Sequence, residues 1–376
     1  MHRSVTCVAI LAISACHGDA PRGGTGAASS DGSGSSGAGS SADAALSACT
    51  ETPIFPPRST GDSGNDLYRK IVVDPATHDL YFSDLHTIYR VAAGGGEPQV
   101  VLPRAKGGGR QFWLAPDRLL VAGNDVWLDN KVHAVLFTMP RGGGDLQPMI
   151  DVPAGDVRTF RSVEDIEIIG DDVYWRLDEG TRGGHDTTHT LLTTSWTHPG
   201  QPRVLYTTKL NASGDLLTSG SVIAGGRVYL LEDRGKSADP HAATVIDLAT
   251  GAVSQADPGL NGYVVDGDAN WILVRHDSSK DGKMGLIRMR PDGSQAVQIG
   301  TSLRPHLATR GDTWALADHN GKTATTEVSV IAASGEKKLL GCVNGDATVH
   351  AIAIGDDAIY VSVFRNNKAT ILRFAR

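Results

Sequence analysis

Two histidines four residues apart form the most local arrangement in this sequence that could bind a metal. His185 and His189 flank Asp186-Thr187-Thr188. Side chains at positions i and i+4 of a strand point the same way, so both imidazoles could reach one zinc ion. A structural zinc site takes four protein ligands, however, and His198 is the only further candidate nearby in the sequence. We therefore favour an exposed, solvated hairpin over a zinc site.

The other local motifs indicate no reaction class. The segment Asp277-Ser278-Ser279-Lys280-Asp281-Gly282 has part of the composition of a calcium-binding loop. It lacks the alternating carboxylates and the closing glutamate of such loops, so we interpret it as a turn. The sequence has neither the Gly-x-Ser-x-Gly elbow of serine hydrolases nor a Walker phosphate-binding loop. A catalytic site would therefore have to be assembled from residues of several elements.

The elements that would assemble such a site repeat along the chain with a period of about 45 residues. Each unit has an apolar run, a Gly/Asp turn and a strand centred on an aromatic residue. The aromatic residues are Tyr81, Trp127, Tyr174, Tyr229, Trp271, Trp314 and Tyr360, spaced by 46, 47, 55, 42, 43 and 46 residues. Seven units, each with room for four short strands, predict an all-β, seven-bladed β-propeller over residues 49–376. We expect the aromatic residues to pack each blade against its neighbour.

The first residues of the chain predict export and a lipid anchor. A basic start leads into an apolar stretch, Val5–Ala15, which is typical of a secretory signal. The sequence Ile13-Ser14-Ala15-Cys16 resembles the lipobox of bacterial lipoproteins, which implies a signal peptide over residues 1–15 and a lipid on Cys16. The alternative is an ordinary signal peptide with a chance cysteine. His17 follows the cysteine where an aspartate would favour the inner membrane, so the resemblance favours the outer membrane.

Composition separates a linker from a folded domain. Residues 16–48 are mostly Gly, Ser and Ala, which have little to bury and predict a flexible tether between the lipidated cysteine and the domain. The net charge is −7, from 35 Lys and Arg against 42 Asp and Glu. That balance argues against a nucleic-acid partner, because such proteins carry a clustered basic excess. We expect a monomer that contacts the membrane only through its lipid.

The last unit of the repeat is short, and this predicts how the ring closes. After Tyr360 only one further strand follows, over Ala369–Ala375. An unpaired outer edge would be a liability, so we expect the segment around Cys49–Phe55 to supply the fourth strand of the last blade. The prolines at positions 53, 56 and 57 suit an outermost edge strand.

Cysteine use agrees with this closure. Cys7 leaves with the signal peptide and Cys16 takes the lipid, so Cys49 and Cys342 remain. Two remaining cysteines usually pair in an oxidising compartment, and Cys342 lies at the end of the sixth unit, beside the expected closure. We therefore predict a disulfide between them; the alternative is two free buried thiols.

One unit resembles a known propeller family. The run Leu80-Tyr81-Phe82-Ser83-Asp84, then Ile88-Tyr89-Arg90-Val91 and Gly94-Gly95-Gly96, is similar to the YWTD and related NHL-type repeats. Their hallmark is Tyr-Trp-Thr-Asp, then Ile-x-Arg, then a glycine turn. The resemblance implies a propeller that binds proteins, peptides or glycans, and a few related propellers are enzymes.

Enzymatic propellers usually work where the innermost strands begin, at the central channel. Counting back seven to ten residues from the aromatic positions gives the channel-mouth candidates Asp117, Glu164, Asn261, His306 and His350, together with Arg118, Asp165, Glu167 and Arg304. Lactonase-like propellers hold a calcium ion there with Glu, Asn and Asp. Resemblance to them would assign Glu164, Asn261 and Asp117 as ligands. The arginines and histidines in the same ring would repel a cation, so we favour a polar, water-filled lining without a cofactor.

Two functional hypotheses follow. The first is a membrane-anchored, extracytoplasmic propeller that acts as a binding or scaffolding module for a protein, peptide or envelope polymer. The second is a metal-dependent hydrolase or lactonase-like enzyme with its site in the central channel. We favour the first, because the sequence combines a tether and a rigid ring without a catalytic motif.

Overall fold

Only strands, turns and loops occur in the part of the chain that the computed structural model describes. The described residues are 49–59, 70–84, 87–103, 111–128, 131–153, 159–181, 187–210, 217–233, 243–256, 262–267, 270–277, 284–291, 294–300, 306–320 and 323–376. They belong to one compact unit, residues 46–376. Within these ranges, no helix is present that could cross a membrane.

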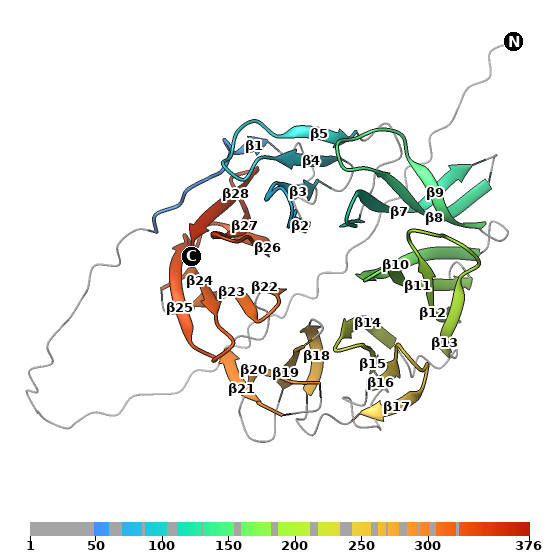
Figure 1. Cartoon of the computed structure of the whole chain (residues 1–376). Helices are drawn as coiled ribbons and strands as arrows, with labels where there is room; N and C mark the ends of the chain where they lie inside the picture. Colours follow the sequence, from blue (N-terminus) through green and yellow to red (C-terminus); the bar gives the residue numbers. More distant parts are fainter. Residues whose placement is uncertain are drawn as a thin grey trace, which may run out of the picture. The chain divides into compact units, whose positions relative to one another are not determined.

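The strands form seven four-stranded antiparallel sheets around a ring, which we number as blades 1–7 in chain order (Figure 1). Blade 1 holds β2 (Lys70–Val73), β3 (Leu80–Ser83), β4 (Ile88–Val91) and β5 (Gln99–Leu102); blade 2 holds β6 (Gln111–Leu114), β7 (Arg118–Leu128), β8 (Lys131–Pro140) and β9 (Gln147–Pro153). Blade 3 holds β10 (Thr159–Ile169), β11 (Asp172–Thr181), β12 (Thr187–Ser195) and β13 (Arg203–Leu210); blade 4 holds β14 (Leu217–Ala224), β15 (Arg227–Asp233), β16 (Ala243–Asp247) and β17 (Val253–Ala256). Blade 5 holds β18 (Gly262–Gly267), β19 (Ile272–Asp277), β20 (Met284–Met289) and β21 (Val297–Gly300); blade 6 holds β22 (His306–Arg310), β23 (Thr313–Asn320), β24 (Thr325–Ile331) and β25 (Lys337–Val343). Blade 7 holds β26 (Thr348–Ile354), β27 (Ala358–Arg365), β28 (Lys368–Ala375) and, from the other end of the domain, β1 (Arg58–Ser59). The predicted seven-bladed β-propeller is confirmed.

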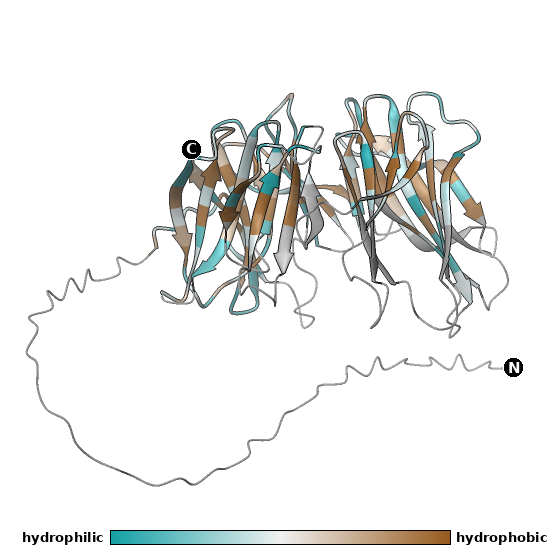
Figure 2. Ribbon diagram, turned by 90° about the horizontal axis from the view of Figure 1, so that it is seen from below, coloured by the Kyte–Doolittle hydropathy of each residue, from teal (hydrophilic) through white to brown (hydrophobic). Residues whose placement is uncertain are grey.

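The buried hydrophobic residues form seven clusters, and each cluster joins two neighbouring blades. Tyr81 of blade 1 packs with Leu119 of blade 2, for example, and Trp271 packs with Trp314 across blades 5 and 6. These four side chains are almost completely buried. Burying one large apolar side chain contributes about 1.5–3 kcal/mol. Figure 2 shows the hydrophobic residues running along the strands and hydrophilic ones in many of the turns. Contacts between blades therefore hold the ring together.

Blade 2 departs from the predicted pattern. Its second strand, β7, begins at Arg118, so Trp127 lies near the far end of an 11-residue strand. The segment Gly123-Asn124-Asp125 resembles a turn in the sequence, but there the pairing of β7 with β8 shifts register, as at a β-bulge. Glycine and asparagine serve bulges as well as turns. Leu120 is the residue of β7 that packs with Trp175 of blade 3, so the assignment of Trp127 as the repeat position was wrong.

The motif of blade 1 that resembles the YWTD repeat has a local structural role. Asp84 accepts a hydrogen bond from the backbone N–H of Thr87 at 2.8 Å and one from the hydroxyl of Tyr89 at 2.8 Å. Both contacts lie within the hairpin of β3 and β4. The aspartate therefore fixes the turn of its own hairpin.

The N-terminal end of the described chain closes the ring, and we call residues 49–59 the closing segment. β1 pairs antiparallel with Lys368 and Ala369 of β28, and Pro53 forms a further bridge with Leu372 (Figure 1). The backbone N–H of Ile54 donates to the carbonyl of Ile371 at 2.9 Å. This outermost position tolerates prolines, because its outer edge needs no ladder hydrogen bond.

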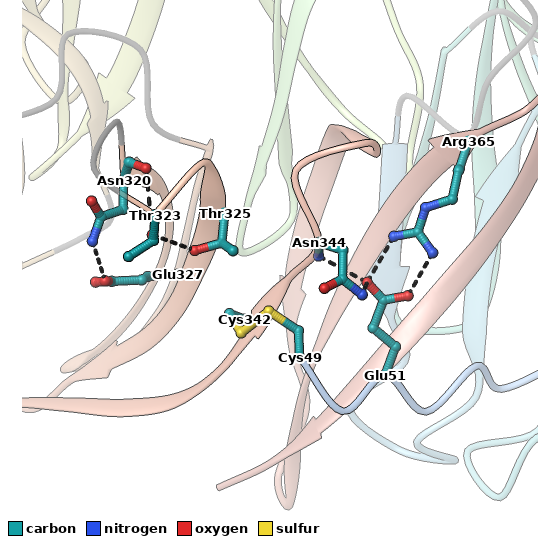
Figure 3. The surroundings of a disulfide bond; sticks show 9 residues. All are labelled: Cys49, Glu51, Asn320, Thr323, Thr325, Glu327, Cys342, Asn344 and Arg365. Carbon is teal, nitrogen blue, oxygen red and sulfur yellow. Dashed lines mark hydrogen bonds and ion pairs between the residues drawn. A yellow bond between two sulfur atoms is a disulfide. The ribbon is translucent and has the colours of Figure 1, made fainter. Parts of the chain in front are cut away.

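A disulfide and an ion pair fasten the closing segment to blades 6 and 7. Cys49 is bonded to Cys342 of β25, with the two Cα atoms 5.3 Å apart (Figure 3). Glu51 accepts two hydrogen bonds from Arg365, at 2.9 and 2.8 Å, and one from the backbone N–H of Asn344 at 2.9 Å. Burial alone would raise the pKa of Glu51, but these bonds hold it below its ordinary value. We call the disulfide and this ion pair the clasp.

Candidate functional site

The first strand of each blade lies nearest the centre of the ring, and neighbouring first strands contact one another (Figure 1). In blades 3, 4, 5 and 7, the pairing of this strand with the second one shifts register. In blade 7 the shift lies between Val349 and Ala351, which makes His350 the extra residue. Such bulges re-aim side chains, so strict alternation does not decide which residues line the channel.

Lys70 and Trp113 form the most unusual polar contact on these inner strands. Lys70 begins β2, and its Nζ lies 4.0 Å from the ring centroid of Trp113 and 5.9 Å from that of Phe112, both on β6. This is the geometry of a cation–π interaction. Burial lowers the pKa of Lys70 to about 8, although the negative charge of Glu167 on β10 acts in the opposite direction. The sequence analysis missed Lys70 and Trp113, which lie on the first strands of consecutive blades.

His306 and His350 lie on the first strands of blades 6 and 7, of which blade 7 is next to blade 1 in the ring. Burial lowers the pKa of His306, and a hydrogen bond to the backbone of Val349 partly offsets this. The ring of His350 meets Phe364 edge-on at 6.3 Å. Because Lys70 and His306 both begin first strands, they lie on the same face of the ring, which we call the strand-start face.

Asp117 lies elsewhere. It is part of the turn that joins the end of β6 to β7, its side chain is 60% exposed, and it forms an ion pair with Arg118 at 2.9 Å. The prediction that Asp117 lies where an inner strand begins was therefore wrong, because it was counted back from Trp127. The ends and the starts of the first strands lie on opposite faces of the ring, so Asp117 cannot join residues of the strand-start face.

The other two predicted calcium ligands are placed only in part. Glu164 lies on β10 opposite Arg176 of β11, just before the register shift, and its side chain is outside the description. Asn261 lies outside the described residues, as do Arg304 and His185. Among the residues that the structure describes, no group of three or more His, Cys, Asp or Glu side chains could hold a metal ion.

Blade 3 buries a charged triad that the sequence analysis did not anticipate. Nδ1 of His189 on β12 lies 2.6 Å from Oδ1 of Asp178 on β11, and Arg176 donates to both carboxylate oxygens of Asp178 at 2.7 and 3.0 Å. The three residues are at most 9% exposed. Although burial raises it, the bonds from His189 and Arg176 hold the pKa of Asp178 below its ordinary value.

The histidine motif therefore has a different role from the one expected. His189 is buried, so the interpretation of its hairpin as fully solvated was wrong. His198 is exposed in the turn after β12, where its Nδ1 lies 3.0 Å from the hydroxyl of Thr197. In the hairpin register Asp178 stands directly opposite His189. The contact of Oδ1 with Nδ1 partners one ring nitrogen, whereas Nε2 is buried without a hydrogen-bond partner among the described residues.

Comparisons with known proteins identify the architecture. No family model and no curated protein matches the chain. Among solved structures, the chain is similar to the β-propeller domain of the trilobed protease from Pyrococcus furiosus, with 9% identity over 81% of this chain and 94% of that one, and a TM-score of 0.54. It is also similar to the hydrazine synthase of Kuenenia stuttgartiensis, with 13% identity over 83% of this chain and 97% of that one, and a TM-score of 0.51.

A third similarity covers only part of a larger protein. Acylaminoacyl peptidase from Pyrococcus horikoshii matches with 9% identity over 78% of this chain and a TM-score of 0.55, but only 48% of the peptidase chain is covered. This chain thus spans about half the length of that enzyme. At these identities the comparisons establish the propeller fold alone.

Proposed function

We propose that this protein is a lipid-anchored propeller on the extracytoplasmic side of a bacterial membrane, where it binds a protein, peptide or envelope polymer. The observation that carries the proposal is the clasp. A disulfide that closes the ring suits an oxidising, exported compartment. The clasp also fastens the point at which residues 16–48, the predicted tether, enter the domain. A ring closed there keeps its binding surfaces rigid.

Binding is favoured over catalysis by the way polar residues are distributed. The displacement of Asp117 removes one ligand from the calcium set suggested by lactonase-like propellers. The peptidase similarity covers about half of that enzyme and carries no argument for peptidase activity here. The sequence of blade 1, with its resemblance to YWTD and NHL repeats, supports a protein, peptide or glycan as the partner.

The lipid anchor can be tested with a single substitution. Cys16→Ser is expected to release the protein from the membrane fraction and to abolish its labelling with palmitate, because no acceptor thiol would remain at the cleavage site. Cys7→Ser is the matched control, since it changes a cysteine of the same leader but should leave both properties intact. A Cys16→Ser variant that stays in the membrane through a carbonate wash would contradict the anchor.

A binding module and a metal enzyme should respond differently to removal of calcium by a chelator. We expect the mature protein to unfold at the same temperature in excess chelator and in millimolar calcium. A site occupied at 100 times its dissociation constant would add about 2.7 kcal/mol and raise the midpoint by at least a degree. Such a rise in calcium would favour the lactonase-like alternative and would direct mutagenesis to Glu164 and Asn261.

The binding function itself can be tested by site-specific photo-crosslinking in whole cells. A crosslinking amino acid at Lys368 samples the strand-start face, and one at Glu336 samples the opposite face; both residues are exposed. A discrete adduct from one of the two positions, lost when the clasp is removed, would support a partner held by the closed ring. Identical adduct patterns from both faces would indicate random encounters and contradict a specific binding surface.

A further inference from the structure

Among the described residues, the ammonium group of Lys70 has fewer hydrogen-bond acceptors around it than it has N–H donors. Its side chain is half-buried at the start of β2. Within the described part of the chain, the contacts of Nζ are the rings of Trp113 and Phe112, and the charge of Glu167 acts on it from β10. An ammonium group carries three N–H donors, and an aromatic ring face is a weak substitute for an acceptor oxygen.

We propose that the strand-start end of the central channel binds an oxyanion, a carboxylate or a phosphate group, on the ammonium group of Lys70. An oxyanion would supply the acceptor oxygens that the Lys70 donors lack, in a place where partial burial strengthens the attraction between charges. His306 begins the first strand of blade 6 on the same face of the ring. The inference goes beyond the proposed function, because it needs neither the lipid nor a macromolecular partner.

The charges around Lys70 decide how this binding should depend on pH. Two titratable groups lie on the strands beside β2, namely His350 on β26 and Tyr81 on β3. The hydroxyl of Tyr81 donates a hydrogen bond to the carbonyl of Arg141. The third neighbouring strand, β6, has no titratable side chain. Glu167 on β10 favours the protonated form of Lys70. The lysine pKa is about 8. Only the protonated amine attracts an anion, so affinity should fall about tenfold for each pH unit above that value.

The test is a lysine-specific NMR titration of the full mature chain in detergent, with 13C at lysine Cε. We expect the Lys70 signal to titrate near pH 8. Adding inorganic phosphate in one arm and glucuronate in the other should raise the Lys70 midpoint, relative to sodium chloride of equal ionic strength. The arm that produces the larger rise identifies which oxyanion the site prefers.

Four variants make the result specific. Lys70→Met keeps the aliphatic contact with Trp113 and should abolish anion binding measured by calorimetry, whereas Lys368→Met should leave it unchanged. Lys70→Arg should bind with an affinity that no longer falls above pH 8, because a guanidinium does not titrate there. Well below pH 8, where Lys70 stays protonated with or without Glu167, Glu167→Gln should tighten binding, since it removes a negative charge near the anion.

Two outcomes would overturn the proposal. One is a Lys70 midpoint that neither phosphate nor glucuronate moves beyond the chloride control. The other is equal anion affinity in the wild type and in Lys70→Met, which would locate the binding elsewhere.

Discussion

Replacement of both cysteines of the clasp, Cys49→Ser with Cys342→Ser, is expected to lower the free energy of unfolding by about 2–5 kcal/mol. The disulfide joins residues 293 positions apart, so its loss frees a very long loop in the unfolded chain and the effect should lie at the upper end. Chemical denaturation of the variant and of the wild type measures the difference directly.

The same change should open the ring locally. The amide of Ile54, which donates to Ile371, is expected to exchange with solvent much faster in the double variant. The amide of Leu248, which donates to Gly226 in blade 4, serves as the control and should exchange as before. Reductant should destabilise the wild type but not the double variant. Equal stability of reduced and oxidised protein, with reduction verified by thiol titration, would refute a role for the disulfide in closure.

The second large effect is expected for Asp178→Asn, which should cost about 3–5 kcal/mol. The substitution removes the carboxylate that both Arg176 and His189 use, so a buried guanidinium loses a negatively charged partner. Asp117→Asn is the matched control. That carboxylate also pairs with a neighbouring arginine, but it is exposed, and exposed pairs contribute about 0–1 kcal/mol.

A double-mutant cycle separates the charge effect from simple loss of packing. If the loss of a negative charge beside the guanidinium causes the loss of stability, Arg176→Met combined with Asp178→Asn should be more stable than Asp178→Asn alone. A double variant as unstable as the sum of the two single ones would mean that the triad acts by packing only.

The triad of Arg176, Asp178 and His189 also predicts that the stability of the protein depends on pH in the acid range. The pKa of Asp178 is lowered in the folded state, so the unfolded chain binds its proton first as the pH falls. The stability contributed by this carboxylate is therefore present above its ordinary value of 3.8 and is lost as the pH falls below that value towards the lowered pKa. The wild type should lose stability over that range, and Asp178→Asn should lose less.

Most of the architecture could be predicted because a propeller repeats. All seven aromatic positions lie in or directly before the second strand of their blade, although Trp127 lies near the far end of its strand. The pairing of the closing segment with β28 follows from counting the strands of the last unit. The cysteine pairing could be predicted because only two cysteines remain once those of the predicted signal peptide and lipid anchor are set aside. These inferences depend on the repeat period and on the number of strands and cysteines, which small errors in strand boundaries do not change.

The candidate site could be predicted much less well. The segment Gly123-Asn124-Asp125 resembles a turn, so Trp127 was taken as the repeat position of blade 2. Counting back from Trp127 then assigned Asp117 to the wrong face of the ring. His189 appeared solvated because the sequence does not state which residue stands opposite it. A hairpin register that differs by one residue would turn the side chain of Asp178 to the other face of the sheet.

The amino-acid sequence by itself determined the number of blades, the closure and the disulfide. The repeated apolar pattern sets the number of blades, the short last unit sets the closure, and the two remaining cysteines set the disulfide. Only the tertiary structure decided which polar residues meet. Lys70 and Trp113 are 43 positions apart and come from different blades, and Glu167 comes from a third. Their proximity results from the packing of neighbouring blades around the ring, which no local sequence pattern states.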